Sequence, residues 1–115
     1  MLKKIGDYLE ICDFFAETVS TPDPERGQRG VIKGFLKTNT PVKVLYMASL
    51  ELDNIEMHES VRLSIESGEN TLELPEISVI NPIVSSNGEG GKYTLTLKIY
   101  ASGAVEHRFD TEIGF

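Results

Sequence analysis

The chain has 115 residues, of which 40% are hydrophobic and 25% are charged, and its formal net charge is −7 at pH 7. This length and composition predict one globular domain and exclude a disordered chain. The acidic balance argues against direct binding to nucleic acid, which requires Lys and Arg to neutralise phosphates. Since no apolar run approaches the ~20 residues of a membrane span, we also expect no membrane insertion.

The N-terminal segment has the apolar spacing of an amphipathic helix, with steps of alternately three and four residues. The stripe consists of Leu2, Ile5, Leu9, Cys12, Ala16 and Val19. We therefore predict a short α-helix over residues 1–19. Ile11 and Phe14 interrupt its polar side, so the helix either packs on two sides or is partly a strand. Tyr8 and Phe14 are its candidate contacts with a protein partner.

Residues 20–30 contain no apolar side chain but include two prolines and two glycines. This composition is typical of a linker or long loop, or of a mobile binding arm. We therefore predict that a β-sandwich domain follows it, over residues 31–115.

The first part of that domain has strand periodicity. We predict a strand over residues 31–37, and apolar residues then alternate with polar ones over 42–52 and 55–65. A two-residue loop at Asp53 and Asn54 predicts a hairpin in which Leu50 faces Met57. This register sets Glu51 opposite Glu56 and Glu59 on the inward face. A bulge near His58 to Ser60 would turn Glu59 outward.

The second part begins with a turn at 67–70 and a short strand that stops at Pro75. An irregular strand over 77–84 and a glycine-rich loop over 85–91 lead to a C-terminal hairpin, 92–115. A three-residue loop at 101–103 would pair Leu97 with His107 and Leu95 with Phe109. It would also pair Ile99 with Val105, Lys98 with Glu106 and Lys92 with Glu112.

The run Glu89, Gly90, Gly91, Lys92, Tyr93, Thr94, Leu95 resembles the approach to strand F in immunoglobulin-like domains. The resemblance makes Tyr93 the corner tyrosine and puts Leu95 where antibody-type domains have a cysteine. The chain has no tryptophan. The C-terminal hairpin is also similar to the ending of short uncharacterised bacterial β-sandwich proteins. The expected fold is thus mainly β, an antiparallel immunoglobulin-like sandwich with one short N-terminal α-helix.

The acidic excess is concentrated between residues 51 and 76, where Arg62 is the only basic residue. The acidic residues there are Glu51, Asp53, Glu56, Glu59, Glu66, Glu69, Glu73 and Glu76. Such a segment is either a solvated surface or a docking face for a basic partner. We take Glu51, Glu56 and Glu66 as candidate partner-binding residues.

No residue pattern specifies catalysis, a metal or a cofactor, and we assign no residue to any of these roles. His58 and His107 lack metal-ligand spacing, and His107 is expected to face inward. A serine with His58 and Glu59 could form a hydrolytic set, but neighbours in a strand point to opposite faces. A calcium loop at Asp53, Asn54 and Glu56 lacks the EF-hand pattern.

We therefore expect a non-catalytic protein-interaction or structural module. The first alternative is an acidic inhibitor that occupies the basic groove of a nucleic-acid-binding protein, and the second is a metal-dependent or hydrolytic enzyme. The single cysteine, Cys12, favours a reducing compartment, and residues 1–10 lack the apolar run of a signal peptide. The expected location is thus the cytoplasm. Exposed strand edges would also allow a homodimer.

Overall fold

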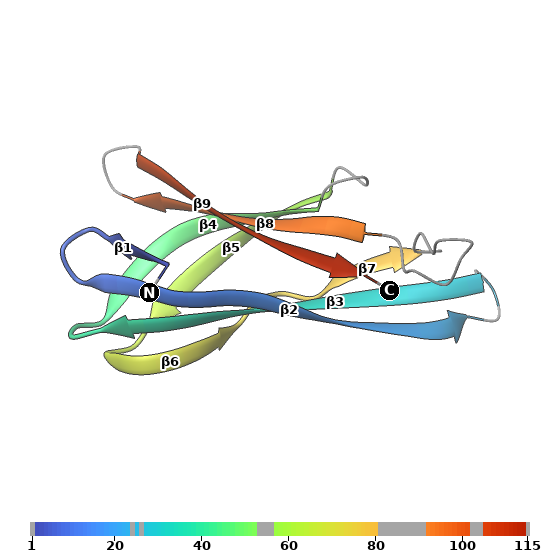
Figure 1. Ribbon diagram of the computed structural model, residues 1–115, viewed down its shortest axis with the longest axis horizontal. Coiled ribbons are helices and arrows are strands. Elements are labelled where there is room, and N and C mark those ends of the chain that lie inside the picture. The colour runs from blue at the N-terminus through green and yellow to red at the C-terminus, as the bar shows by residue number, and fades with distance from the viewer. Residues whose placement is uncertain are drawn as a thin grey trace.

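The computed structural model describes residues 2–23, 25, 27–52, 57–80, 92–101 and 105–114. These residues form two antiparallel β-sheets in a molecule about 47 Å long and 25 Å across (Figure 1). The strands are β1 (Lys3–Ile5), β2 (Leu9–Asp23), β3 (Gly27–Thr40), β4 (Val44–Leu52), β5 (Met57–Ile65), β6 (Gly68–Glu73), β7 (Ile77–Ile80), β8 (Lys92–Ala101) and β9 (Val105–Gly114). The mainly β, antiparallel fold is confirmed.

The first sheet has the strand order β1-β2-β3-β6, and β7 also pairs with β3. β3 is its central strand, since β2 covers one edge of it while β6 and β7 share the other. The second sheet has the order β5-β4-β8-β9.

The core lies between the sheets, because alternate residues of each strand point inward. In β3 these inward positions include Ile32 and Leu36, and in β8 they include Leu95 and Leu97, all at most 1% exposed. The other core residues are Ile5, Leu9, Ile11, Phe14, Ala48, Leu50, Leu52, Val61, Leu63, Ile65, Leu74, Ile77, Val79, Tyr93, Ile99, Phe109 and Ile113.

The prediction of a helix over residues 1–19 is wrong. Lys3–Ile5 and the beginning of β2 are strands joined by a turn at residues 6–8, and the part of the chain that the structure describes contains no helix. A register shift between Ile11 and Asp13 explains the misleading spacing. Since a bulge adds one residue to a strand, the buried positions jump from Ile11 to Phe14, a step of three. The turn and the bulge together imitate the period of a helix.

Within the range 20–30, where we expect a linker or long loop, residues 20–23 and 27–30 belong to strands. β2 continues to Asp23 and β3 begins at Gly27, with Ser20 opposite Gly30 and Thr21 opposite Arg29. Residues without apolar side chains can extend a hairpin, because the hydrogen bonds of the ladder come from the backbone. The first sheet therefore includes residues that lie before position 31.

Both predicted hairpins exist, but each register is wrong by two residues. Leu50 faces Glu59 rather than Met57, and Leu97 faces Phe109 rather than His107. Because side chains alternate with a period of two, a shift of two residues keeps every side chain on its predicted face. The expected burial of Leu95 and Phe109 on the same face is therefore confirmed.

Several predicted cross-strand pairs are lost with these registers. Lys98 faces Arg108, and Lys92 faces Gly114, instead of the glutamates expected there. Glu51 faces His58, not Glu56. β5 pairs with β4 without a register shift, so the expected bulge near His58 to Ser60 is wrong. Glu59 remains on the inward side, half-buried.

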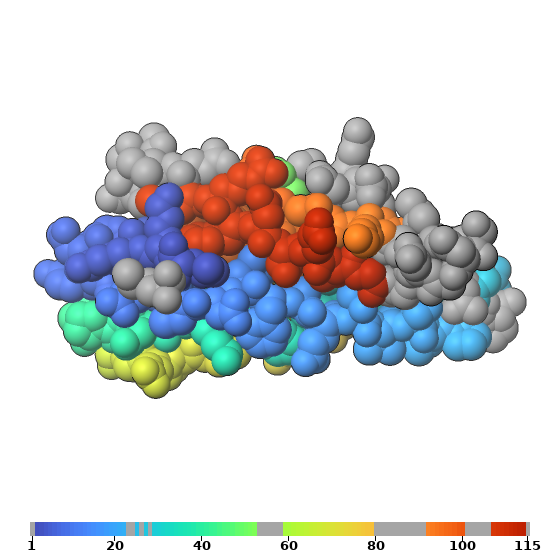
Figure 2. All heavy atoms as spheres, viewed as in Figure 1, coloured from blue at the N-terminus to red at the C-terminus, as the bar shows by residue number. Residues whose placement is uncertain are grey.

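The two long sides of the molecule differ. On one side, the edge strand β9 lies against β2, as Figure 2 shows, and the Thr18 hydroxyl donates a 2.7 Å hydrogen bond to the carbonyl of Gly114. On the opposite side, the edges belong to β5 in one sheet and to β6 and β7 in the other.

Phe14→Ala should lower the free energy of unfolding by about 3–5 kcal/mol, because it removes a core side chain that is 5% exposed. Tyr8→Ala is the matched control, since Tyr8 is 54% exposed and its loss should change stability by less than about 0.5 kcal/mol. Urea denaturation of both variants measures the difference. Equal stabilities would contradict the position of β2 in the core.

Candidate functional site on the outer face of the four-stranded sheet

Three large apolar side chains lie exposed on the outer face of the second sheet. Leu45 and Met47 in β4 are 63% and 49% exposed, and Tyr100 in β8 is 44% exposed. Met47 and Tyr100 are directly opposite each other in the ladder, and Leu45 is on the same face two residues earlier. We call Leu45, Met47 and Tyr100 the apolar patch.

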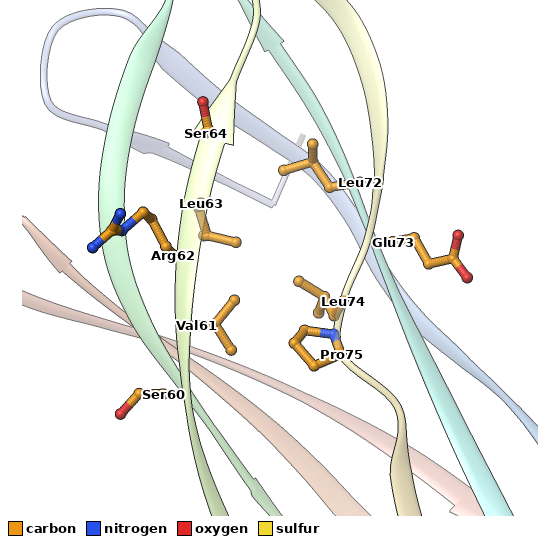
Figure 3. Close-up of a pocket in the computed structure, with 9 residues that line it drawn as sticks. All are labelled: Ser60, Val61, Arg62, Leu63, Ser64, Leu72, Glu73, Leu74 and Pro75. Carbon is orange, nitrogen blue, oxygen red and sulfur yellow. The ribbon is translucent and has the colours of Figure 1, made fainter.

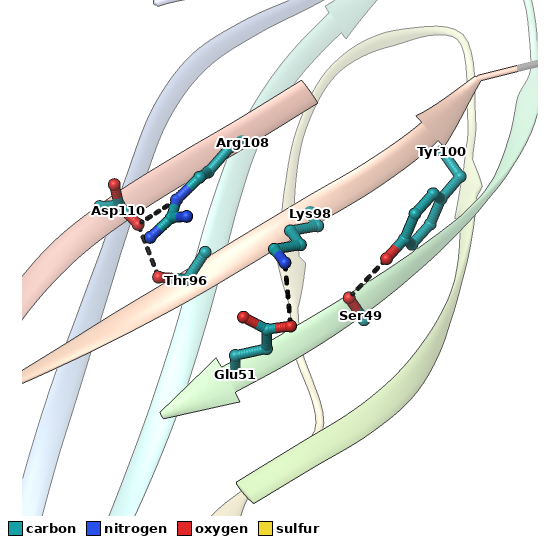
Figure 4. A network of polar contacts seen from close by, with 7 residues as sticks. All are labelled: Ser49, Glu51, Thr96, Lys98, Tyr100, Arg108 and Asp110. Carbon is teal, nitrogen blue, oxygen red and sulfur yellow. Dashed lines mark hydrogen bonds and ion pairs between the residues drawn. The ribbon is translucent and has the colours of Figure 1, made fainter. Parts of the chain in front are cut away.

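A polar network borders the apolar patch on the same face (Figure 4). The Lys98 ammonium lies 3.1 Å from the Glu51 carboxylate, and both side chains are half-buried. The Ser49 and Tyr100 hydroxyls lie 3.3 Å apart, so that Tyr100 belongs to the patch through its ring and to the network through its hydroxyl. Glu51 and Lys98, the charged groups of this part of the network, thus neutralise each other within the sheet.

The far side of the network is built on Thr96, which is only 2% exposed although it faces outward. Its hydroxyl donates a 2.6 Å hydrogen bond to the Asp110 carboxylate. The Arg108 guanidinium lies 3.3 Å from the same carboxylate oxygen. Neighbouring side chains of the network therefore cover Thr96.

The outer face of the first sheet is different. Its aromatic residues Phe15 and Phe35 stack on each other, with ring centroids 5.2 Å apart. The Lys37 ammonium lies 5.7 Å from the centroid of the Phe15 ring, in a cation–π contact. Both rings are only half-exposed. The rings are thus partly covered by each other and by Lys37, whereas Leu45 and Met47 are exposed to solvent.

The acidic residues proposed from the sequence do not gather on one face. Glu51 pairs with Lys98 on the second sheet, and Glu66, at its edge, lies 3.2 Å from the Lys43 ammonium. On the side of the first sheet, Glu73 and Glu76 both pair with Lys33. A hydrogen bond and the negative charge of Glu73 raise the Lys33 pKa. Glu56 lies outside the described residues.

Of the two candidate contacts from the N-terminal segment, only Tyr8 is exposed. It lies in the turn between β1 and β2, 54% exposed. Phe14 points into the core and is not available to a partner, which corrects its selection as a contact residue.

Potential metal ligands are not brought together among the residues that the structure describes. No cluster of three or more histidine, cysteine, aspartate or glutamate side chains could hold a metal ion there. The loop with Asp53, Asn54 and Glu56 lies outside the described part, as does the His58 side chain. Among the described residues there is also no helix long and apolar enough to cross a membrane.

His107 is half-buried on the inward side of β9, opposite Ile99 rather than Leu97. Its Nδ1 atom is buried and has no hydrogen-bond partner. Burial lowers the His107 pKa, and the positive charge of Lys3 lowers it further. This environment favours the neutral imidazole.

Sequence reasoning missed the apolar patch, although a signal for it existed. Val44 and Tyr46 alternate with Leu45 and Met47, so both faces of β4 are apolar over these residues. Only the inward series was used to assign the core. An apolar series on the second face of a strand indicates either burial on both sides or an exposed binding surface.

No protein-family model matches the chain, and no curated protein matches its sequence. Its fold is similar to part of the β-glucuronidase of Parabacteroides merdae, with a TM-score of 0.63 and 16% identity over 93% of this chain. A structure of that enzyme with glycerol in its active site gives a TM-score of 0.64 and 13% identity.

A third similar structure is the exo-chitosanase CsxA of Amycolatopsis orientalis, with a TM-score of 0.59 and 12% identity over 92% of this chain. The chain spans only 13% of the length of each of these glycosidases. At this level of identity the likeness concerns the fold alone.

Thr96→Val should lower the free energy of unfolding by about 1 kcal/mol, because it removes the hydrogen bond to Asp110 and keeps the shape of the side chain. Thr94→Val is the matched control, since Thr94 is on the same face of β8 and is less buried. Thermal or urea unfolding measures both. A larger loss for Thr94→Val would contradict the described network.

Protonation of His107 should destabilise the protein. A lowered pKa means that the folded state binds this proton less readily than the unfolded state. Stability contributed by the neutral imidazole is therefore present above the ordinary histidine pKa of about 6.5 and is lost as the pH falls through the lower folded value. The unfolding free energy should decrease more between pH 7.5 and pH 5 in the wild type than in His107→Gln. Parallel pH profiles would show that His107 does not contribute.

Proposed function

We propose that this chain is a non-catalytic interaction or structural module that docks onto another protein through its apolar patch. The observation that carries this proposal is the exposure of Leu45, Met47 and Tyr100 side by side on a sheet face. Protein interfaces combine such an apolar centre with a polar rim. Here the rim is the network of Glu51, Lys98 and Ser49, whose groups are already paired.

A paired rim favours docking. Charges that are neutralised within one surface need no new counter-charge from the partner, so the desolvation cost of covering them is reduced. The ring of Tyr100 can be covered while its hydroxyl keeps the contact with Ser49. We therefore infer a partner with an apolar surface and without strong positive charge.

The structural comparisons support a role as one module of a larger assembly. The β-glucuronidase and the exo-chitosanase each contain a similar fold as a small part of a long chain. We propose that the present module has the immunoglobulin-like form of the sandwich and packs against a larger enzyme or its assembly without reacting itself. We keep the cytoplasm as the proposed location, supported by the single thiol of Cys12.

The acidic-inhibitor alternative has less support. An inhibitor that fills a basic groove presents unpaired carboxylates together, whereas Glu51 and Glu66 each have a lysine partner. Its affinity would also fall steeply with salt, because it would depend on charge. Docking through the apolar patch should persist at high salt.

The double variant Leu45→Ser and Met47→Ser should lose the partner, because it removes most of the apolar patch. Val19→Ser is the matched control, since Val19 is 58% exposed but lies in the first sheet. Tagged wild-type protein and both variants are used to recover partners from native cells at 50 mM and about 500 mM salt. A recovered protein is then purified and mixed with the module, and hydrogen exchange is measured.

The proposal requires a protein that binds the wild type and Val19→Ser at both salt concentrations and that loses at least about tenfold in affinity for the double variant. It must also protect amides of β4 and β8 from exchange. Binding that vanishes at high salt and survives the double variant would instead favour the acidic inhibitor.

A further inference from the structure

The edge strand β5 has one unoccupied side. Among the described strands β5 pairs only with β4, so the backbone groups along its other side have no partner strand. Such an edge is a template for another extended chain. Natural proteins usually protect these edges with inward-pointing charges, bulges or prolines.

β5 carries one of these protections, and only at one end. Glu59 points toward the core side, half-buried, which disfavours strand addition beside it. From Ser60 to Ser64 the strand has no proline, no bulge and no inward charge. This five-residue stretch is about 16 Å long.

A groove of about 520 Å³ follows this stretch (Figure 3). Its other wall is formed by Leu72, Glu73, Leu74 and Pro75, where the edge of the first sheet is interrupted between β6 and β7. Figure 3 shows the side chains of Val61 and Leu63 on one wall pointing toward those of Leu72 and Leu74 on the other. The groove therefore has an apolar floor beneath a free strand edge.

We propose that this groove binds an extended peptide segment of a partner protein, which adds to the second sheet as a strand beside β5. Backbone hydrogen bonds to residues 60–64 supply affinity, and the pocket between the walls selects alternate side chains. The inward-facing residues of the peptide must be apolar and of moderate size, because they contact Val61 and Leu63 on one side and Leu74 on the other.

The outward-facing residue at the centre of the peptide should be acidic. Arg62 is exposed in the middle of the stretch and makes no ion pair within the part of the chain that the structure describes. In Figure 3 its side chain turns away from the groove, over the sheet. Residues that face each other on adjacent strands are close enough for a glutamate of the peptide to pair with it.

The opposite wall of the groove gives no reason to expect a second acidic residue in the peptide. Glu73 borders the groove there, and its carboxylate is already paired with Lys33. Figure 3 shows Glu73 pointing away from the groove. No residue of this wall carries a positive charge that a second carboxylate could pair with, so the groove prefers one carboxylate, on the β5 side.

The test uses the acetylated and amidated peptide Thr-Val-Glu-Val-Thr, whose two valines can face the floor while glutamate faces Arg62. Titration is followed by amide chemical shifts of the full-length protein. We expect the largest shifts at residues 60–64 and slower amide exchange there. The same peptide with N-methyl groups on its three central residues should not bind, because it lacks the donors of a strand.

Charge exchange tests the role of Arg62. Arg62→Glu should lower the affinity for the glutamate peptide by about threefold to fivefold and raise the affinity for Thr-Val-Lys-Val-Thr by a similar factor. Arg29→Glu, at an exposed position in the first sheet, is the matched control and should leave both affinities unchanged. The double variant in Leu45 and Met47 should bind the peptide normally, which separates this groove from the patch used in the proposed function.

Shifts that map to other strands, equal binding of the N-methylated peptide, or no reversal of preference in Arg62→Glu would each overturn the proposal. Shifts at residues 60–64 that depend on protein concentration without peptide would also overturn it, because they would identify a second copy of the chain as the occupant.

Discussion

The contact between Gly34 and Leu74 determines the structure of the side of the molecule where the edges of β5, β6 and β7 lie. We call this the open side, and the side where β9 lies against β2 the closed side. Gly34 lies on the inward side of β3, and its carbonyl accepts a 2.9 Å hydrogen bond from the Leu74 amide. A Cβ at this position would be only 3.2 Å from Leu74 Cδ1 and 3.5 Å from Leu95 Cδ2. The missing side chain therefore allows Leu74 to enter the core immediately after β6 ends. Pro75 follows and lacks a backbone donor, so pairing with β3 stops and resumes only at Ile77. The resulting gap forms one wall of the groove.

The closed side shows what this interruption prevents. There β2 is continuous from Leu9 to Asp23, and β9 lies against it, with Thr18 bonded to Gly114. Two continuous edges can approach along a long distance and cover the core with backbone. β5 has no such counterpart, because β6 and β7 are short and separated. The core is covered on that side by the side chains of Leu63 and Leu74, and the strand edge above them stays available.

The sequence predicts the sheet face on which a side chain lies better than it predicts the residue opposite it in the ladder. Alternation placed Leu95 and Phe109 correctly on one face, because burial depends on a period of two and survives a shift of two residues. It could not specify register, since an apolar face accepts either alignment. The N-terminal segment failed for a related reason: the bulge after Ile11 breaks the alternation, and a local count of spacing cannot distinguish a bulged strand from a helix. The concentration of acidic residues between positions 51 and 76 was also misleading as a sign of a binding face. Several of these carboxylates form ion pairs with lysines from outside the segment, namely Lys33, Lys43 and Lys98.

The patch and the β5 wall of the groove are adjacent parts of the second sheet, and Arg62 belongs to this wall. It faces Met47 across the ladder of β4 and β5 and also lies on the wall of the groove. A strand added beside β5 would widen the sheet by about 5 Å and extend the outer face next to Leu45 and Met47. The backbone edge would provide affinity with little dependence on sequence, whereas the patch would require a complementary apolar surface. A partner that presents both an extended segment with one central carboxylate and an apolar surface would gain from both contacts at once, because the second is made at the high effective concentration created by the first.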